Sequence, residues 1–153
     1  MTRGHSELRL RQRLVDRLYT EAMVLADEAR SYFDEGGRAE RDALAPLARV
    51  TFSCESLKVT TRLMHVIAWL LTQRAVMAGE LPSRDALDPS RRIGDAPASD
   101  TDAIAGLPGA ARSLVAASED LHRRIARLDR AQAAPFPAAS PARSMQDRLA
   151  TTF

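Results

Sequence analysis

The segment from Ser53 to Gly79, SCESLKVTTRLMHVIAWLLTQRAVMAG, constrains the fold of this chain most strongly. It is an unbroken helix-forming run, and its apolar residues occupy more than one face of that helix. A helix with a single neighbour needs only one apolar stripe. The segment is therefore expected to be buried between several helices, either within the chain or across a dimer.

Two apolar stripes follow this helix, which is predicted over about residues 41–78. The stripe expected to face the rest of the chain consists of Leu47, Val50, Cys54, Leu57, Thr61, Met64, Ala68, Leu71 and Ala75. The stripe expected to be free for another contact consists of Val59, Leu63, Val66, Ile67, Leu70 and Met77. Tryptophan is enriched at interaction hot spots, although a single tryptophan inside a helix is usually a core residue. The sequence therefore predicts a homodimer contact formed by Val66, Trp69, Leu70 and Met77.

Two further helices are predicted on either side of this one. The first covers about residues 6–34, with Ser6 as its N-cap and Gly36-Gly37 as its stop. The third covers about residues 108–130, and its apolar residues recur at alternating steps of three and four, as in helices that pack at a shallow angle. The prediction is an all-α protein, an antiparallel three-helix bundle over residues 1–130 that runs up, down and up.

Two segments rich in proline are expected to lie outside the helices. Residues 81–107 form a linker that is longer than usual within a compact domain, and we expect it to be flexible. Residues 131–153 form a Pro/Ala-rich tail with the composition of a disordered segment. The far end of the tail regains apolar residues, so Met145, Leu149 and Phe153 are predicted to act as a tethered partner-binding motif.

No catalytic signature occurs in the sequence: it contains no Walker loop, GxGxxG, GxSxG or HExxH pattern. His5, His65 and His122 are not spaced as metal ligands are on a helix. Cys54 is the single cysteine, which excludes an internal disulfide and makes it most simply a small core residue. The chain is therefore predicted not to be an enzyme and to need no cofactor or metal.

The charges leave one alternative function open. The net charge is +2, with 22 basic and 20 acidic side chains mixed along the chain. Arginines cluster at the start of the first helix and at the end of the third, which would suit a DNA-associated helical regulator. In an up-down-up bundle these clusters lie at opposite poles, and no helix-turn-helix pair occurs, so nucleic acid is the weaker interpretation. The clustered residues are Arg9, Arg11, Arg13, Arg17, Arg123, Arg124, Arg127 and Arg130.

No segment is apolar enough to indicate a membrane span or a signal sequence. The longest apolar run, from Leu63 to Leu71, is far shorter than the ~20 residues that a bilayer requires. The N-terminus lacks the apolar core of a signal peptide. We therefore expect a soluble, cytoplasmic protein with no membrane partner.

The stretch from Ala48 to Glu80 resembles the central helix of the RcdA family, named for regulator of CtrA degradation. The resemblance is carried by Ser53-Cys54-Glu55-Ser56, Thr60-Thr61-Arg62-Leu63-Met64 and Ala68-Trp69-Leu70-Leu71. The preceding stretch, from Glu28 to Glu40, resembles the family's first helix and its glycine turn.

This resemblance implies a homodimeric three-helix bundle with a flexible C-terminal tail. It also implies a non-enzymatic adaptor that helps to deliver cell-cycle regulators, such as the response regulator CtrA, to the ClpXP protease. The resemblance further implies other adaptors, such as CpdR and PopA, as partners.

Overall fold

Helices make up the structure, and no strand occurs in the part of the chain that the computed structural model describes, which is residues 2–134, 145, 148 and 149. Five α-helices occur there, where the sequence predicted three. They are α1 (Thr2–Ser31), α2 (Arg38–Asp42), α3 (Pro46–Met77), α4 (Thr101–Ala105) and α5 (Gly109–Ala133). A π-helical turn (Tyr32–Gly36) follows α1, and two 3-10 turns (Ser83–Leu87 and Pro89–Arg91) follow α3.

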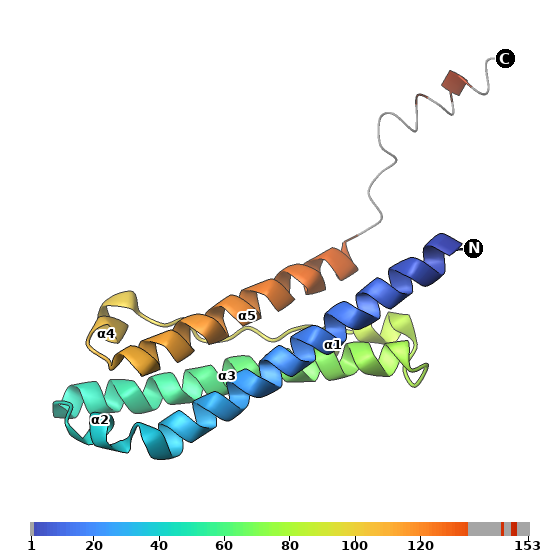
Figure 1. Cartoon of the computed structure of the whole chain (residues 1–153). Coiled ribbons are helices and arrows are strands. Elements are labelled where there is room, and N and C mark those ends of the chain that lie inside the picture. The colour runs from blue at the N-terminus through green and yellow to red at the C-terminus, as the bar shows by residue number, and fades with distance from the viewer. Residues whose placement is uncertain (1, 135–144, 146–147, 150–153) are drawn as a thin grey trace.

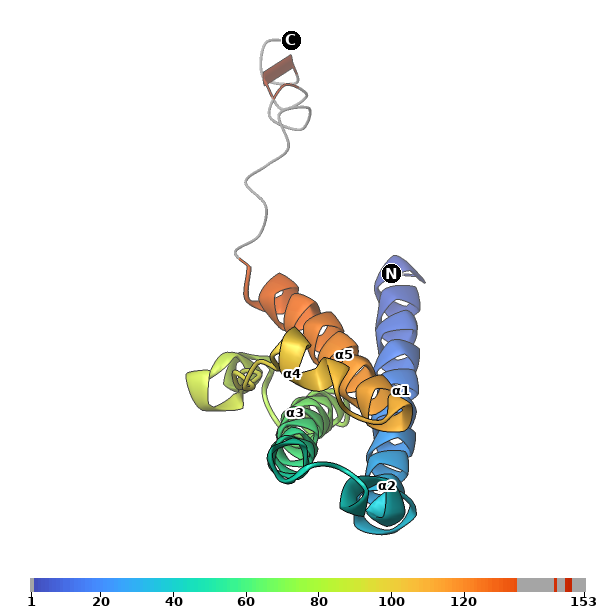
Figure 2. The same cartoon turned by 90° about the vertical axis from the view of Figure 1, so that its left-hand side faces the viewer.

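The three long helices, α1, α3 and α5, lie side by side (Figures 1 and 2). Helix α1 runs antiparallel to α3, since Arg11 near the start of α1 donates to Gln73 near the end of α3 at 3.3 Å. Helix α5 runs parallel to α3, because Arg62 donates to Ser118 at 3.2 Å and Gln73 donates to Gln132 at 3.1 Å. The predicted up-down-up order is therefore wrong, and the long helices run up, down and down.

A tight turn joins α1 to α2 and requires glycine at residue 37. A Cβ atom at Gly37 would lie 2.8 Å from the Tyr32 carbonyl oxygen and 2.9 Å from the Tyr32 ring. The Tyr32 hydroxyl donates to Glu40 at 2.6 Å and so holds the two sides of the turn together. Beside it, the rings of Phe33 and Phe52 pack edge to face with centroids 5.2 Å apart, which closes this end of the core.

The core shows that the prediction for the two faces of α3 was wrong: the face expected to be free is buried, and the face expected to be buried is exposed. Members of the face expected to be free are buried in the chain's own core: Val59, Leu63, Val66 and Leu70. The face expected to be buried carries five exposed side chains, with exposed fractions of 80% for Leu47, 59% for Val50, 68% for Leu57, 64% for Met64 and 47% for Leu71. Both faces are similarly apolar, so the periodicity of the apolar residues does not distinguish them.

Residues 81–107, which we call the strap, connect the end of α3 to the start of α5. The strap runs back along the bundle in Figure 1, so that α5 starts at the same pole as α3. His65 and His122 each donate a ring N–H to the Gly94 carbonyl, at 3.2 and 2.9 Å. A Cβ atom on Gly94 would lie 2.9 Å from the His65 ring, so glycine allows this close approach.

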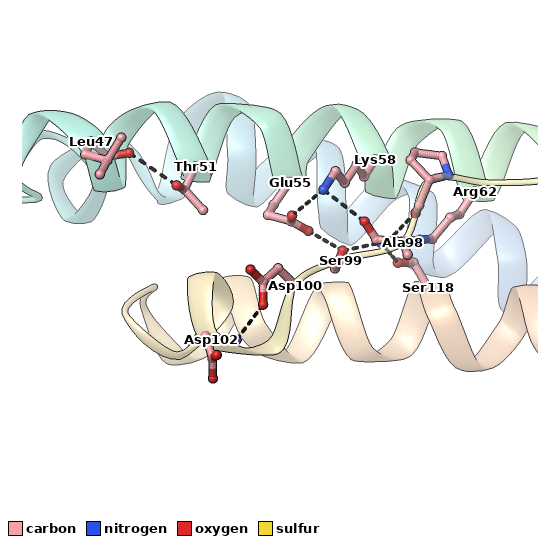
Figure 3. A network of polar contacts seen from close by, with 11 residues as sticks. Leu47, Thr51, Glu55, Lys58, Arg62, Ala98, Ser99, Asp100, Asp102 and Ser118 are labelled. Atoms are coloured by element: carbon pink, nitrogen blue, oxygen red, sulfur yellow. Dashed lines mark hydrogen bonds and ion pairs between the residues drawn. The ribbon is translucent and has the colours of Figure 1, made fainter.

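Arg62 attaches the next part of the strap to α3 (Figure 3). Its guanidinium, with the residue only 2% exposed, donates to the Pro97 carbonyl at 2.9 Å and to the Ser99 hydroxyl at 2.6 Å. Lys58 donates to the Ala98 carbonyl at 3.0 Å. These contacts correct the expectation of a flexible linker, because the strap is fixed to α3 by the buried Arg62 and by the half-buried Lys58.

Candidate protein-binding surfaces

The exposed face of α3 forms a continuous apolar seam. We use the name α3 seam for Leu47, Val50, Cys54, Leu57, Thr61, Met64, Ala68, Leu71 and Ala75, which alternate in steps of three and four along four heptads. All nine are exposed or half-buried. The opposite side of the helix is buried, with Phe52, Val59, Val66 and Gln73 at most 2% exposed. Helix α3 therefore has two apolar faces, one packed in the core and one open.

Polar side chains beside the seam have their partners within the chain. Lys58 lies 3.0 Å from Glu55, and Arg74 lies 3.6 Å from Asp16 of α1. Arg74 also lies 4.6 Å from the centre of the Tyr19 ring. Because these charges are partly neutralised by the chain itself, the flanks present little charge that would repel a second helix.

A second apolar surface lies where α1 begins and α5 ends. A cleft of about 390 Å³ between these ends is lined by Leu10, Leu14, Val15, Trp69, Leu128 and Ala131, together with Arg11 and Gln132. Leu10 is 63% exposed and Leu14 is 43% exposed. Helix α5 ends at Ala133, two residues after Ala131 of the cleft lining, so the tail begins beside this cleft.

The residues predicted to form the dimer contact lie elsewhere. Val66, Trp69 and Leu70 are at most 4% exposed, and Met77 is partly buried against the same core. The Trp69 indole donates to the Asp129 carboxylate at 2.9 Å, and Arg92 of the strap donates to the same carboxylate at 2.8 Å. The chain's own helices and strap therefore cover Val66, Trp69 and Leu70, whereas the α3 seam is open.

Two of the three predicted tail residues fall within the described part of the chain. Met145 is 66% exposed and Leu149 is 57% exposed. Phe153 lies outside the described residues. The partner-binding role of these residues stays a prediction.

The two arginine clusters meet at one pole of the molecule, which corrects the sequence-based expectation of opposite poles. Because α5 runs parallel to α3, its last turns lie near the start of α1 (Figure 1). The exposed members are Arg9, Arg11, Arg13, Arg17, Arg123, Arg127 and Arg130. Acidic side chains are interspersed, since Arg124 is bonded to both Glu21 and Asp120.

Among the residues that the structure describes, no three His, Cys, Asp or Glu side chains gather as metal ligands would. The pKa values of Tyr32 and Arg124 are both raised. Burial, followed by the hydrogen bond to Glu40, raises the pKa of Tyr32 above its ordinary value. The hydrogen bond to Glu21 raises the pKa of Arg124. No helix in the described part of the chain is both long and apolar enough to cross a bilayer.

These features define a protein that is helical over its described residues and that carries open apolar helix faces. The model of a family of proteins of unknown function, DUF1465, matches residues 6–153. The crystal structure of RcdA from Caulobacter crescentus CB15 is similar, with 35% sequence identity and a TM-score of 0.64, over 78% of this chain and 90% of that one. No curated protein matches the chain. The chain therefore belongs to the RcdA family, which the sequence resemblance had indicated.

Proposed function

We propose that the protein is a non-enzymatic adaptor that helps to deliver cell-cycle regulators such as CtrA to the ClpXP protease. The observation that carries the proposal is membership of the RcdA family, combined with the open apolar surfaces of α3 and of the α1–α5 cleft. The mechanism is tethering, in which one surface holds cargo while another holds a protease-bound partner. Tethering of this kind raises the effective concentration of the cargo to about the millimolar range for short flexible links.

The positions of the open surfaces suggest a separate role for each of them. The α3 seam faces away from the core and suits a homodimer contact, while the cleft lined by Leu10 and Leu14 lies beside the start of the tail. Met145, Leu149 and Phe153 are proposed to bind a partner such as a response regulator or another adaptor. A short segment of this kind pays an ordering cost on binding and so binds with modest affinity, which suits a carrier that must release its cargo.

The proposal is tested by recovering partners from a lysate with the full chain and with a chain that ends at Ala134. We expect the full chain to recover response regulators or ClpX-associated adaptors, and the shortened chain to lose them. Recovery that is unchanged by the truncation would move the contact to the helical surfaces. Recovery of neither class of partner by either chain would contradict the adaptor function.

A second candidate function is a DNA-associated helical regulator, and the common pole of the two arginine clusters favours it. It predicts duplex binding that weakens steeply as salt is raised, because arginine contacts to phosphates release counterions. Titration of a labelled duplex at low salt checks this. An absence of binding at low salt would contradict the DNA-associated role and leave the adaptor function untouched.

A further inference from the structure

The α3 seam separates its residues by size in a way that bears on how two copies could pair. One set, at every seventh position, is small from Cys54 onward: Cys54, Thr61, Ala68 and Ala75, with Leu47 at its start as the one large member. The other set, also at every seventh position, is large: Val50, Leu57, Met64 and Leu71. The seam spans four heptads, which is enough for a two-stranded coiled coil, and α3 is about 48 Å long at the usual rise per residue.

The relative direction of two paired α3 helices decides which sets meet. In a parallel, in-register pair each layer holds two equivalent residues, so layers of two alanines or two threonines alternate with layers of two large side chains. The small layers then leave gaps, and gaps in a packed interface cost the contacts of the side chains that line them. In an antiparallel pair each small residue faces a large one, and all layers have similar volume.

From this pattern we propose that two copies of the chain pair along the α3 seam in antiparallel orientation, with Cys54 of each copy beside Leu71 of the other. This inference rests on the homodimer of the proposed function. In the same register Thr61 faces Met64, Ala68 faces Leu57 and Ala75 faces Val50. Leu47, the most exposed large side chain of the seam, then faces the exposed Ala78 at the end of the opposite helix.

The surroundings of the seam allow this pairing. Lys58 and Arg74, the charged residues that flank the seam positions, are engaged by Glu55 and Asp16 of their own chain. Helices α1 and α5 pack on the opposite, buried side of α3, so they extend away from the second copy. The pattern is complementary to itself, which favours a second copy over an unrelated helix as the occupant.

Antiparallel pairing fixes where the two tails begin. Helix α5 ends beside Gln73, through the 3.0 Å bond that Gln132 donates to Gln73. In the proposed register the two Gln73 residues lie about 30 Å apart along the helix axis. The dimer therefore presents its two tails, and its two apolar clefts, from opposite ends, so that each end can hold a different partner.

The single native cysteine allows a direct test in the full-length protein. The Leu71→Cys variant keeps Cys54, and in the proposed register the two thiols face each other across the seam. Within one helix these two residues are about 25 Å apart, so they cannot form an internal disulfide. We expect mild oxidation by copper phenanthroline to convert Leu71→Cys into a covalent dimer on a non-reducing gel, at least about tenfold faster than the native chain.

Three comparisons complete the test. The double variant Cys54→Ser/Leu71→Cys has equivalent cysteines about 25 Å apart in the antiparallel pair, so we expect it to cross-link slowly, whereas a parallel pair would bring them together. Fast cross-linking of this variant or of the native chain would overturn the orientation. In the proposed register a cysteine at Leu57 lies more than about 15 Å along the axis from every cysteine of the other copy, so faster cross-linking by Leu57→Cys than by Leu71→Cys would overturn the register. A monomer by light scattering would contradict the homodimer itself, whereas a differently oriented dimer would leave the proposed function intact.

Discussion

Replacement of Arg62 by methionine tests whether the strap is held by the buried guanidinium. Methionine keeps a long, unbranched side chain, but it removes the donors to the Pro97 carbonyl, the Ser99 hydroxyl and the Ser118 hydroxyl. Arg62 is 2% exposed, so water in the folded state does not replace these bonds freely. The strap should therefore loosen along residues 97–99 while the three long helices stay folded.

The expected loss in the free energy of unfolding follows from the number of hydrogen bonds that Arg62 makes. Hydrogen bonds from a charged donor contribute about 1.5 kcal/mol each at the low end, so the three bonds together contribute about 4.5 kcal/mol. Burial of the methionine side chain returns about 1.5 kcal/mol. We therefore expect the free energy of unfolding to fall by about 3 kcal/mol in Arg62→Met.

Urea unfolding followed by circular dichroism measures this loss, and limited trypsin digestion at Arg91 and Arg92 reports on the strap. The control is Arg123→Met, because Arg123 is 68% exposed and its nearest carboxylate, Asp120, is 3.9 Å away. We expect the control to change stability by less than about 0.5 kcal/mol. A loss below about 1 kcal/mol in Arg62→Met, with no faster cleavage at the strap, would refute the reasoning.

Two further predictions concern the turn and the seam. Gly37→Ala should destabilise the fold by about 1–3 kcal/mol, because its Cβ would overlap Tyr32, whereas Gly36→Ala, whose Cβ meets nothing closer than 3.7 Å, should cost less than about 1 kcal/mol. Thermal unfolding of the pair checks this, and equal losses would contradict it. The double substitution Leu57→Glu/Met64→Glu should convert the dimer into a monomer by light scattering with little change in the urea midpoint, since both side chains are more than 60% exposed. Unfolding of this variant, or a persistent dimer, would contradict the assignment of the seam.

Helical periodicity predicted the parts of the fold that depend on a single apolar stripe. On α5 and just before it, the residues at the predicted alternating steps of three and four are buried: Leu107, Ala111, Leu114, Ser118, Leu121 and Ile125. On α1, Val15, Leu18, Ala22 and Ala29 recur at helical spacing and are buried, while Leu8 is 62% exposed near the start of the helix. A helix with one apolar face leaves no choice about which side packs on the core.

Periodicity failed where two answers fitted equally well. Both faces of α3 are apolar, so the sequence did not show which would pack against α1 and α5. The three-four alternation of the α3 seam does not decide the question, since α5 has the same alternation on its buried face. The sequence does not distinguish the buried Arg62, Glu55 and Asp129 from surface residues, because charged groups are seldom buried without partners that only the tertiary structure supplies.

The length of the strap explains why the direction of α5 differs from the predicted one. Short loops make neighbouring helices antiparallel, but a strap of this length can return along the whole of α3. A fully extended segment of about 25 residues spans roughly 80 Å, which is well beyond the length of α3. The strap therefore allows α5 to run parallel to α3, which brings both arginine clusters, the apolar cleft and the start of the tail to one pole.

The rate at which ClpXP degrades CtrA in a reconstituted reaction, with and without this protein, tests the adaptor function most directly. The reaction contains the other adaptors of the pathway, and the chain ending at Ala134 serves as the matched control. We predict that the full chain increases the initial degradation rate and that the shortened chain, folded by circular dichroism, does not. A degradation rate that the full chain leaves unchanged, under conditions where the other adaptors are active, would contradict the account.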